Sequence, residues 1–264
     1  MGMVFKDRNI IITGASSGIG AALAVEFASE GARLHLLARN MERLSTVAQA
    51  CRSIGAQVEE YQVDMADMAS IDSFCATYLD KGCGLDVLVL NAGISQRSDA
   101  LYTEASVTRG IMETDFFGPV HMTTCLAGLI RSSKDFRIAV TSSISGLFGF
   151  PLRSAYCAAK HALFGYFETI EIENPQVRVT FLIPGRINTP ISRSARLADG
   201  SGYGQMDPGQ ARGVSAEKCA RKAVKAIARG KRRKLIGGAE LLMVHIKRLC
   251  PSLFFFLARR VSSV

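Results

Sequence analysis

Two residues of a predicted helix carry side chains suited to proton transfer. Tyr156 and Lys160 lie four residues apart, so on a helix their side chains share one face, one turn apart. A tyrosine alone is a poor acid or base near neutral pH, because its unperturbed pKa is about 10, but a nearby ammonium favours the phenolate and lowers that pKa. Ser143, at a predicted strand end, can orient a carbonyl against the phenol. This set suits proton transfer at an oxygen while a hydride moves at the adjacent carbon.

A glycine-rich turn near the start of the chain is typical of a nucleotide site. Residues 10–12 form an apolar run that predicts a buried strand, and a helical stretch follows the turn and ends at Gly31. Glycines in the GxxxGxG turn let the backbone approach a pyrophosphate, whose charge is favoured by the helix N-terminus. The candidate cofactor-binding residues of the turn are Gly14, Ser16, Ser17, Gly18, Ile19 and Gly20.

The rest of the chain alternates strands and helices. Further strands are predicted at residues 33–38, 58–63, 85–90, 136–143, 177–183 and 234–236, and most of residues 103–130 is predicted to be helical. The pattern predicts an α/β, single-domain Rossmann fold with a doubly wound parallel sheet of about seven strands. We place this domain at residues 1–237, followed by an apolar and basic appendage at 238–264. Candidate site residues follow the strands and should share one edge: Gly14, Arg39, Asp64, Asn91, Ser143 and Pro184.

The end of the second strand indicates which dinucleotide binds. An acid there would hydrogen-bond a ribose 2′-hydroxyl, whereas an arginine accommodates a 2′-phosphate. Arg39 follows this strand, and no acid precedes Glu42. The sequence therefore favours NADP(H) over NAD(H), with a solvated first-turn arginine as the alternative interpretation of Arg39.

The distribution of charge and the pattern of cysteines limit which classes of partner and which compartment the sequence predicts. The net charge is +9, and residues 229–260 carry nine Lys/Arg and one acid, or +8, which leaves +1 for the rest. The basicity therefore belongs to the tail, and we expect no nucleic-acid partner. Seven cysteines form no CxxC pair and no clustered Cys/His ligand set, so no metal site is expected. The number of cysteines is odd, and the N-terminus has no apolar segment of the kind found in signal peptides. We therefore expect reduced thiols and a cytoplasmic protein.

Taken together, these motifs resemble the short-chain dehydrogenase/reductase family over residues 8 to 190. Within it, residues 94–98, 116–123, 153–163, 197–207 and 248–260 are similar to the dehydrogenase/reductase member seven branch, which is related to the 11β-hydroxysteroid dehydrogenases. The resemblance implies that Tyr156 is the acid/base, that Lys160 lowers its pKa and holds the nicotinamide ribose, and that Ser143 orients the carbonyl. It further implies cofactor contacts by Asp64, Asn91, Ala92, Gly93, Pro184, Gly185, Ile187 and Thr189.

Asp115 departs from the family pattern. Many members have an asparagine there, which supports a water in a proton relay to the lysine. Asp115 can still accept a hydrogen bond, but its charge near Lys160 opposes a lowered tyrosine pKa. Either the relay uses backbone groups or turnover is slow.

The function expected is an NADP(H)-dependent oxidoreductase acting on a carbonyl or secondary alcohol. The related branch implies bulky, lipid-like compounds such as steroids, retinoids or acyl-dihydroxyacetone phosphate. Phe148, Phe150, Leu152 and the loop after Pro190 are predicted to line their pocket, although core packing explains the phenylalanines equally well. The alternatives are a dinucleotide-binding sensor or scaffold protein with little turnover, and a membrane-surface interaction protein.

Two apolar segments of the sequence predict contacts with a second subunit or with a membrane. The family forms dimers or tetramers, and Phe164, Tyr166 and Phe167 make an apolar set too wide for one core-facing stripe, so we expect a homo-oligomer. Residues 240–260 place apolar side chains beside cations but are too interrupted to span a bilayer. That pattern predicts a helix lying at a membrane surface, with packing of residues 253–257 between subunits as an equal alternative.

Overall fold

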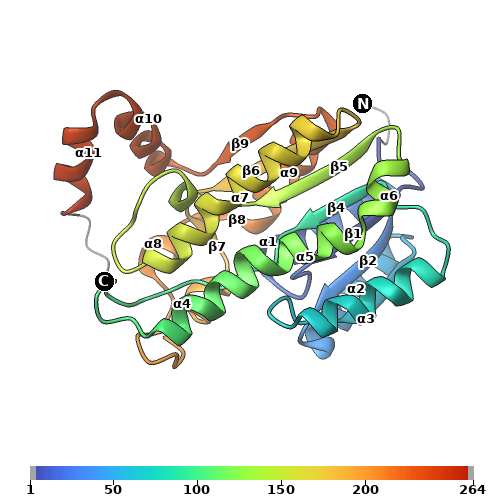
Figure 1. Cartoon of the computed structure of the whole chain (residues 1–264), viewed down its shortest axis with the longest axis horizontal. Helices are drawn as coiled ribbons and strands as arrows, with labels where there is room; N and C mark the ends of the chain where they lie inside the picture. The colour runs from blue at the N-terminus through green and yellow to red at the C-terminus, as the bar shows by residue number, and fades with distance from the viewer. Residues whose placement is uncertain (1–3, 261–264) are drawn as a thin grey trace.

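A single parallel sheet organises the chain in the computed structural model (Figure 1). Within residues 4–260, which the structure describes, seven strands pair in the order β3-β2-β1-β4-β5-β6-β9. Their bounds are β1 (Asn9–Thr13), β2 (Arg33–Ala38), β3 (Val58–Gln62), β4 (Val87–Leu90), β5 (Phe136–Thr141), β6 (Val177–Pro184) and β9 (Arg233–Ile236). The predicted doubly wound fold is confirmed; residues 1–3 and 261–264, the outer ends of the two predicted domains, lie outside the described range.

The strand order reverses beside β1, which pairs with β2 on one side and β4 on the other. Ile10 is in register with both Leu34 and Val87, and all the pairings of this sheet are parallel. The chain therefore leaves β1 and β4 in opposite directions across the sheet. Such a switch point opens a crevice at the carboxyl ends of the strands, where ligands of open α/β sheets bind.

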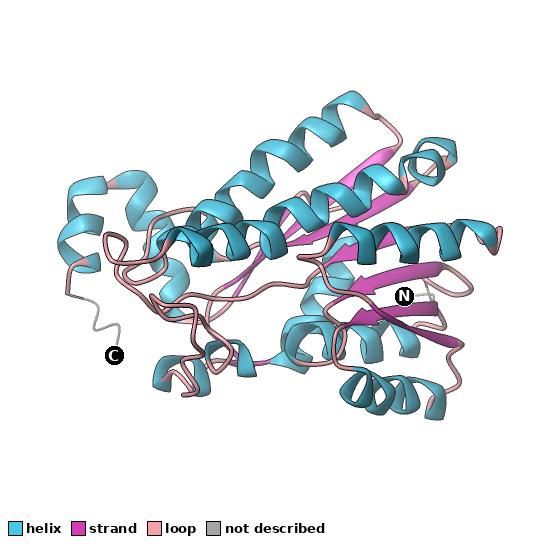
Figure 2. Ribbon diagram, turned by 60° about the horizontal axis from the view of Figure 1, so that its bottom comes forward, coloured by secondary structure: helices cyan, strands magenta, loops and turns pink. Residues whose placement is uncertain are grey.

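Helices cover both faces of the sheet, and Figure 2 shows the two layers. The first face is packed by α1 (Gly18–Ser29), α2 (Met41–Ser53) and α9 (Ala216–Ala228), and the second by α3 (Met68–Asp80), α5 (Gly118–Cys125) and α7 (Ser154–Glu173). Successive residues of β1 point to opposite faces of the sheet. Ile10 and Ile12 pack in the hydrophobic core on the first face, and Ile11 packs in the core on the second. With apolar residues on both faces, the central strands read as continuous hydrophobic runs.

The segment at residues 103–130, predicted to be one long helical stretch, is divided. It contains α4 (Ala105–Met112), a π-helical turn at Glu113–Phe117, α5, and α6 (Ala127–Ser132). Gly118 allows the interruption to pack closely, since a Cβ there would lie 2.0 Å from the carbonyl oxygen of Met65. The π turn directs Asp115 into the interior, where its side chain is fully buried. Such turns are frequent at functional sites.

The loop after Pro190, predicted to be irregular, is partly structured. It contains a short 3₁₀ turn at Pro190–Ser192 and α8 (Pro208–Ala211), which is capped by Asp207. The short strands β7 (Ile187–Asn188) and β8 (Val214–Ser215) pair across its base. The backbone of Arg97 also donates to the carbonyl of Arg196, which ties the loop to the chain after β4.

The tail forms two short helices at one end of the molecule, drawn in red in Figure 1. They are α10 (Leu242–Leu249) and α11 (Pro251–Ala258). The helix predicted for this segment is divided into two, because Pro251 lacks the N–H that would continue α10. Phe254 is buried against Phe148, with ring centroids 4.9 Å apart. Among the described residues, no helix combines the length and apolar character needed to cross a membrane.

Candidate active site

Hydrogen bonds from Thr13 join the carboxyl ends of β1 and β4. Its hydroxyl oxygen accepts from the backbone N–H groups of Asn91 (2.9 Å) and Ala92 (3.0 Å). The Asn91 side chain donates to the Thr13 carbonyl (3.2 Å) and accepts from Thr141 at the end of β5 (3.2 Å). Three strand ends are thus fixed relative to one another, which holds the floor of a cleft.

The glycine-rich turn has the geometry expected for a dinucleotide. Gly14 has φ +66°, and a Cβ there would lie 2.8 Å from the Cα of Ala92, so only glycine fits this close approach. Ser17 starts α1 without a side-chain cap, which leaves the first-turn amides available to an anion. The predicted residues fit a pyrophosphate at this helix N-terminus.

Most of the predicted site residues line this cleft. They are Gly14, Ser16, Ser17, Gly18, Ile19, Arg39, Asp64, Asn91, Ala92, Gly93, Ser143, Tyr156, Lys160, Pro184, Gly185, Ile187 and Thr189. Gly20 instead supports the turn, since a Cβ there would lie 2.2 Å from the Gly14 carbonyl oxygen. Sequence analysis missed Thr13, Asn40, Arg43 and Thr141, which also line the cleft.

A buried ion pair lies beneath the cleft. The Lys160 ammonium is 3.0 Å from the Asp115 carboxylate and donates to the Thr141 carbonyl (3.1 Å). Asp115 also accepts from the backbone N–H of Ile94 (2.8 Å). A Cβ on Gly93 would lie 2.9 Å from the Asp115 carboxylate, so the turn after β4 packs directly on the pair. Burial by itself would lower the pKa of Lys160, but the Asp115 carboxylate and Tyr156 together outweigh burial and raise it. Lys160 therefore stays charged.

Tyr156 and Ser143 lie above this pair. Burial raises the pKa of Tyr156; Lys160 opposes this effect, Asp115 adds to it, and a hydrogen bond with Ser143 opposes it. The net pKa is raised, so the lowering expected from Lys160 is outweighed by desolvation. Ser142, next to Ser143, donates to the Lys160 carbonyl (3.1 Å) and holds α7 against β5. Near neutral pH the phenol is therefore protonated and able to donate.

Arg39 lies exposed at the far end of the cleft. Its guanidinium is 3.7 Å from the Asp64 carboxylate, and Arg43 lines the same end of the cleft. Asn40 caps α2 by accepting from the N–H of Arg43 (2.8 Å), which fixes the start of that helix. Two cations therefore border the position where a cofactor's 2′-substituent would lie.

A second pocket adjoins Tyr156. Ser143 and Tyr156 line it together with the apolar side chains Ile144, Phe148, Phe150, Ile191, Met243 and Phe254. Phe148, Phe150 and the loop after Pro190 occupy the predicted wall, whereas Leu152, in a turn with φ +61°, is not among the described residues that line the pocket. The sequence did not indicate that Phe254 of the tail would complete the wall.

Charged side chains hold one side of this second pocket. Asp207 pairs with the buried Arg97 and with Arg153, the latter at 3.3 Å. The backbone N–H of Gly209 also donates to Asp207 (2.8 Å). This cluster fixes the loop after Pro190 against α7 and the chain after β4. Sequence reasoning missed it, because its residues are more than 50 positions apart.

A parallel sheet with a dinucleotide cleft at its switch point, and a buried Tyr-Lys pair beside a second pocket, defines a nicotinamide-dependent oxidoreductase. A family model described as short chain dehydrogenase matches residues 8–200. The chain belongs to the short-chain dehydrogenase/reductase family.

Curated relatives match almost the full length. The chain is 35% identical to dehydrogenase/reductase SDR family member 7B of Xenopus tropicalis, over 98% of this chain and 87% of that protein. It is 38% identical to the Bos taurus protein of the same name, over 95% of this chain and 80% of that protein. These matches confirm the resemblance to the member seven branch.

Solved structures share the fold. A short chain dehydrogenase/reductase from Burkholderia phymatum in complex with NAD has a TM-score of 0.82 at 23% identity, covering 92% of this chain and 94% of that one. A metagenomic short-chain oxidoreductase in complex with NADP has a TM-score of 0.73 at 24% identity, covering 88% and 98%. Structural neighbours thus bind either nicotinamide cofactor.

The electrostatics predict a pH shift on removing the Asp115 charge. Asp115→Asn keeps the side-chain shape, and loss of the carboxylate should lower the Tyr156 pKa because Asp115 raises it. Oxidation of a secondary alcohol needs the phenolate as base, so the rising limb of its pH–rate profile should move to lower pH. Glu113→Gln, a charge removal in the same π turn, is the control and should leave the limb in place. An unchanged or upward-shifted limb in Asp115→Asn contradicts this coupling.

Proposed function

We propose that the chain is an NADP(H)-dependent oxidoreductase that transfers a hydride between the nicotinamide and a bulky, lipid-like carbonyl or secondary alcohol. One observation carries the proposal: Ser143 and Tyr156 line both the dinucleotide cleft and the second pocket. Their hydroxyls therefore lie where a substrate oxygen and the cofactor meet. The bound cofactor supplies the hydride, and the chain supplies position and a proton.

In this proposal each residue has a distinct role. Tyr156, protonated because its pKa is raised, donates the proton to a substrate carbonyl oxygen. Ser143, which also caps the turn at Ile144–Gly146, orients that oxygen. Lys160 holds positive charge beneath the phenol and stabilises the phenolate left behind. Asp115 positions the Lys160 ammonium. Reduction is favoured over oxidation near neutral pH, because only oxidation needs the phenolate at the outset.

The cofactor preference rests on charge at the end of β2. Arg39 and Arg43 line the cleft there, and a guanidinium can bind a 2′-phosphate through two parallel hydrogen bonds. Asp64 is the acid nearest to Arg39, and its carboxylate pairs with that side chain at 3.7 Å. NADP(H) adds a dianionic group where two cations gather, whereas NAD(H) does not.

The apolar part of the second pocket supports the proposed substrate class. Its aromatic and aliphatic wall suits a large apolar group, with a carbonyl at the Tyr156 end. The competing function is a dinucleotide-binding sensor or scaffold with little turnover, which Asp115, in place of the asparagine of many family members, favours. Turnover of NADPH with a panel of steroid, retinoid and long-chain acyl ketones separates the two.

We also propose that the tail docks on an anionic membrane surface of the cytoplasm. One side of α11 closes the pocket through Phe254, while Phe255 and Phe256 are 51% and 52% exposed and Leu249 is 81% exposed. Lys247 lies 4.3 Å from the Phe255 ring and Arg260 lies 3.6 Å from the Phe256 ring. Apolar side chains bordered by cations match a bilayer interface with acidic headgroups.

We also propose that the chain forms a homo-oligomer, either a dimer or a tetramer. The residues proposed for the contact differ from those predicted from the sequence. Phe164 and Phe167 are buried within one chain, so they do not form the predicted outer surface. Phe117 and Ile172, near the same helices, are exposed instead. They are the apolar side chains that a second copy would cover.

Replacing Tyr156 by phenylalanine should abolish most turnover. The change keeps the ring and removes the hydroxyl, so NADPH binding should persist while the hydride-transfer rate falls by roughly 10²–10⁴. Single-turnover absorbance of NADPH gives the rate, and fluorescence titration gives the binding. Tyr166→Phe, on the same helix, is the matched control. A rate near that of the unmodified chain would show that Tyr156 is not the proton donor.

Replacing Arg39 by alanine should weaken NADPH selectively. A lost charged hydrogen bond is worth about 1.5–3 kcal/mol, or roughly tenfold to 150-fold in Kd. NADH binding should change little. Arg33→Ala, at the opposite end of β2, is the control. The preference is wrong if the unmodified chain binds NADH as tightly as NADPH by calorimetry.

Removing the exposed aromatic rings of α11 should detach the chain from membranes. Phe255→Ser with Phe256→Ser leaves Phe254 in the pocket wall, so cofactor binding should persist while sedimentation with phosphatidylserine vesicles is lost. Leu101→Ser, a 91% exposed apolar residue elsewhere, is the control. Light scattering reports the mass in parallel. No sedimentation of the unmodified chain, or a fall in mass of the double variant with sedimentation unchanged, would instead assign the surface to a partner subunit.

A further inference from the structure

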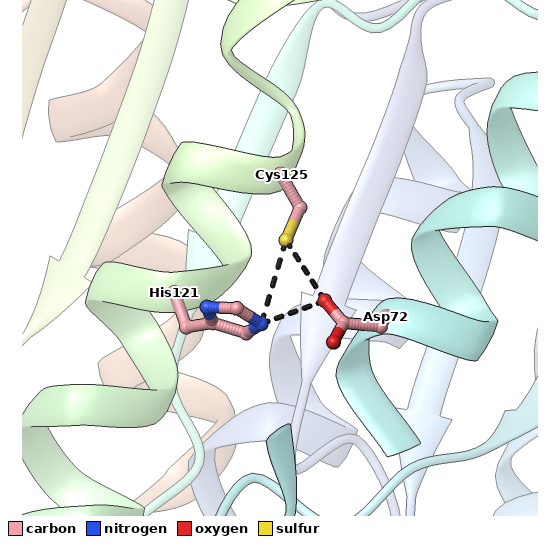
Figure 3. A group of neighbouring side chains, drawn as sticks. All are labelled: Asp72, His121 and Cys125. Atoms are coloured by element: carbon pink, nitrogen blue, oxygen red, sulfur yellow. Dashed lines mark hydrogen bonds and ion pairs between the residues drawn. The ribbon is translucent and has the colours of Figure 1, made fainter. Parts of the chain in front are cut away.

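Three side chains with metal-ligating atoms converge on the surface between α3 and α5. Asp72 comes from α3, and His121 and Cys125 come from α5 (Figure 3). Asp72 Oδ1 lies 2.7 Å from His121 Nε2 and 3.4 Å from Cys125 Sγ, and the last two atoms are 3.6 Å apart. None of the three residues lines the cofactor cleft or the second pocket. The cluster is therefore separate from the site described above.

The spacing of these atoms is close to that of a tetrahedral zinc site. Zn–N, Zn–O and Zn–S bonds of about 2.0–2.3 Å place tetrahedral ligand atoms about 3.4–3.6 Å apart. The two distances to sulfur already have these values. The Asp72–His121 distance would open by about 0.7 Å on that geometry. Asp72 can make this movement, because its side chain is 58% exposed.

The two helices hold the donor atoms in place. His121 and Cys125 are four residues apart on α5, so they lie on one helix face. Buried Ile71 and Phe74 of α3 flank Asp72 in sequence, and buried Met122 lies beside His121. The ligand atoms thus sit at the edge of a packed interface between helices, and metal binding needs only side-chain adjustments.

A second thiol supports Cys125. Cys75, on α3, is a hydrogen-bond partner of Cys125. The Cys125 S–H donates to Asp72 Oδ1 (3.4 Å). Cys75 is buried and lies outside the group of three residues that could hold the ion, so it acts as a donor to a ligand, not as a ligand.

We propose that Asp72, His121 and Cys125 bind one zinc ion that clips α3 to α5 and leaves a fourth position open to water. A nitrogen, a sulfur and a carboxylate oxygen form a ligand set that Zn²⁺ accepts readily. Binding displaces the Cys125 proton and replaces the His121–Asp72 contact by two metal bonds. The proposal revises the expectation, drawn from sequence, that the chain has no metal site.

Cobalt titration of the full chain tests the site directly. After treatment with a chelator and then gel filtration, Co²⁺ alone should produce a sulfur-to-cobalt charge-transfer band that saturates at one equivalent. Zn²⁺ should remove the band by displacement and should raise the thermal midpoint, because a ligand that binds only the folded state stabilises it. Neither readout depends on turnover.

Variants assign the ligands. Cys125→Ser should abolish the band, and His121→Gln and Asp72→Asn should each weaken Zn²⁺ binding at least tenfold. Cys75→Ala should weaken it about tenfold, the usual effect of losing a partner of a ligand. Cys250→Ser and His161→Gln, which change a cysteine and a histidine outside the cluster, are the controls.

The proposal fails if the unmodified chain shows no charge-transfer band, or if the band survives in Cys125→Ser. It also fails if Zn²⁺ raises the thermal midpoint equally in His121→Gln. NADPH titration of every variant checks the fold, so a lost band with normal cofactor binding reports the metal site alone.

Discussion

The buried ion pair between Lys160 and Asp115 constrains the catalytic half of the structure. Its two charges come from α7 and from a π turn, and they meet only because the turn directs Asp115 inward. Removing one partner of such a pair typically costs about 3–5 kcal/mol, since the other charge is left buried alone. The strand end at Thr141, the N–H of Ile94 and the close-packed Gly93 all fix the pair. The position of Lys160 beneath Tyr156 therefore depends on the whole sheet edge.

The sheet and most of the residues that line the cleft could be predicted because their signals are local. Each central strand is a short apolar run. Gly14, Arg39, Asp64, Asn91 and Ser143 follow the ends of their strands by one or two positions, and Pro184 is the last residue of β6. In a parallel sheet those ends must share an edge. Tyr156 and Lys160 needed only the helix period. Asp115 was identified through the family resemblance, and its proximity to Lys160 was predicted correctly.

The remaining features depend on contacts between distant residues. Nothing near Asp207 in sequence indicates that it pairs with Arg97 and Arg153. The tail was predicted as one surface helix, because apolar periodicity cannot show that Phe254 reaches Phe148. The sign of the Tyr156 shift was also beyond the sequence, since desolvation depends on burial in the folded chain. The cluster at Asp72 shows the same limit: His121 and Cys125 share a helix face by spacing, but their third neighbour comes from another helix.

The two pockets are held together by different kinds of contact. The cofactor cleft is formed at strand ends that backbone register and the Thr13 hydrogen bonds fix together. The second pocket is closed by the loop after Pro190 and by the tail. The Asp207 charged cluster and the β7–β8 pairing hold the loop, and the contact of Phe254 with Phe148 helps to hold the tail. Changes in those two segments can therefore alter which molecule binds without disturbing Tyr156 or Lys160. Because α11 contributes Phe254 to the pocket and Phe255 to the surface, whatever covers its outer side also positions the pocket wall.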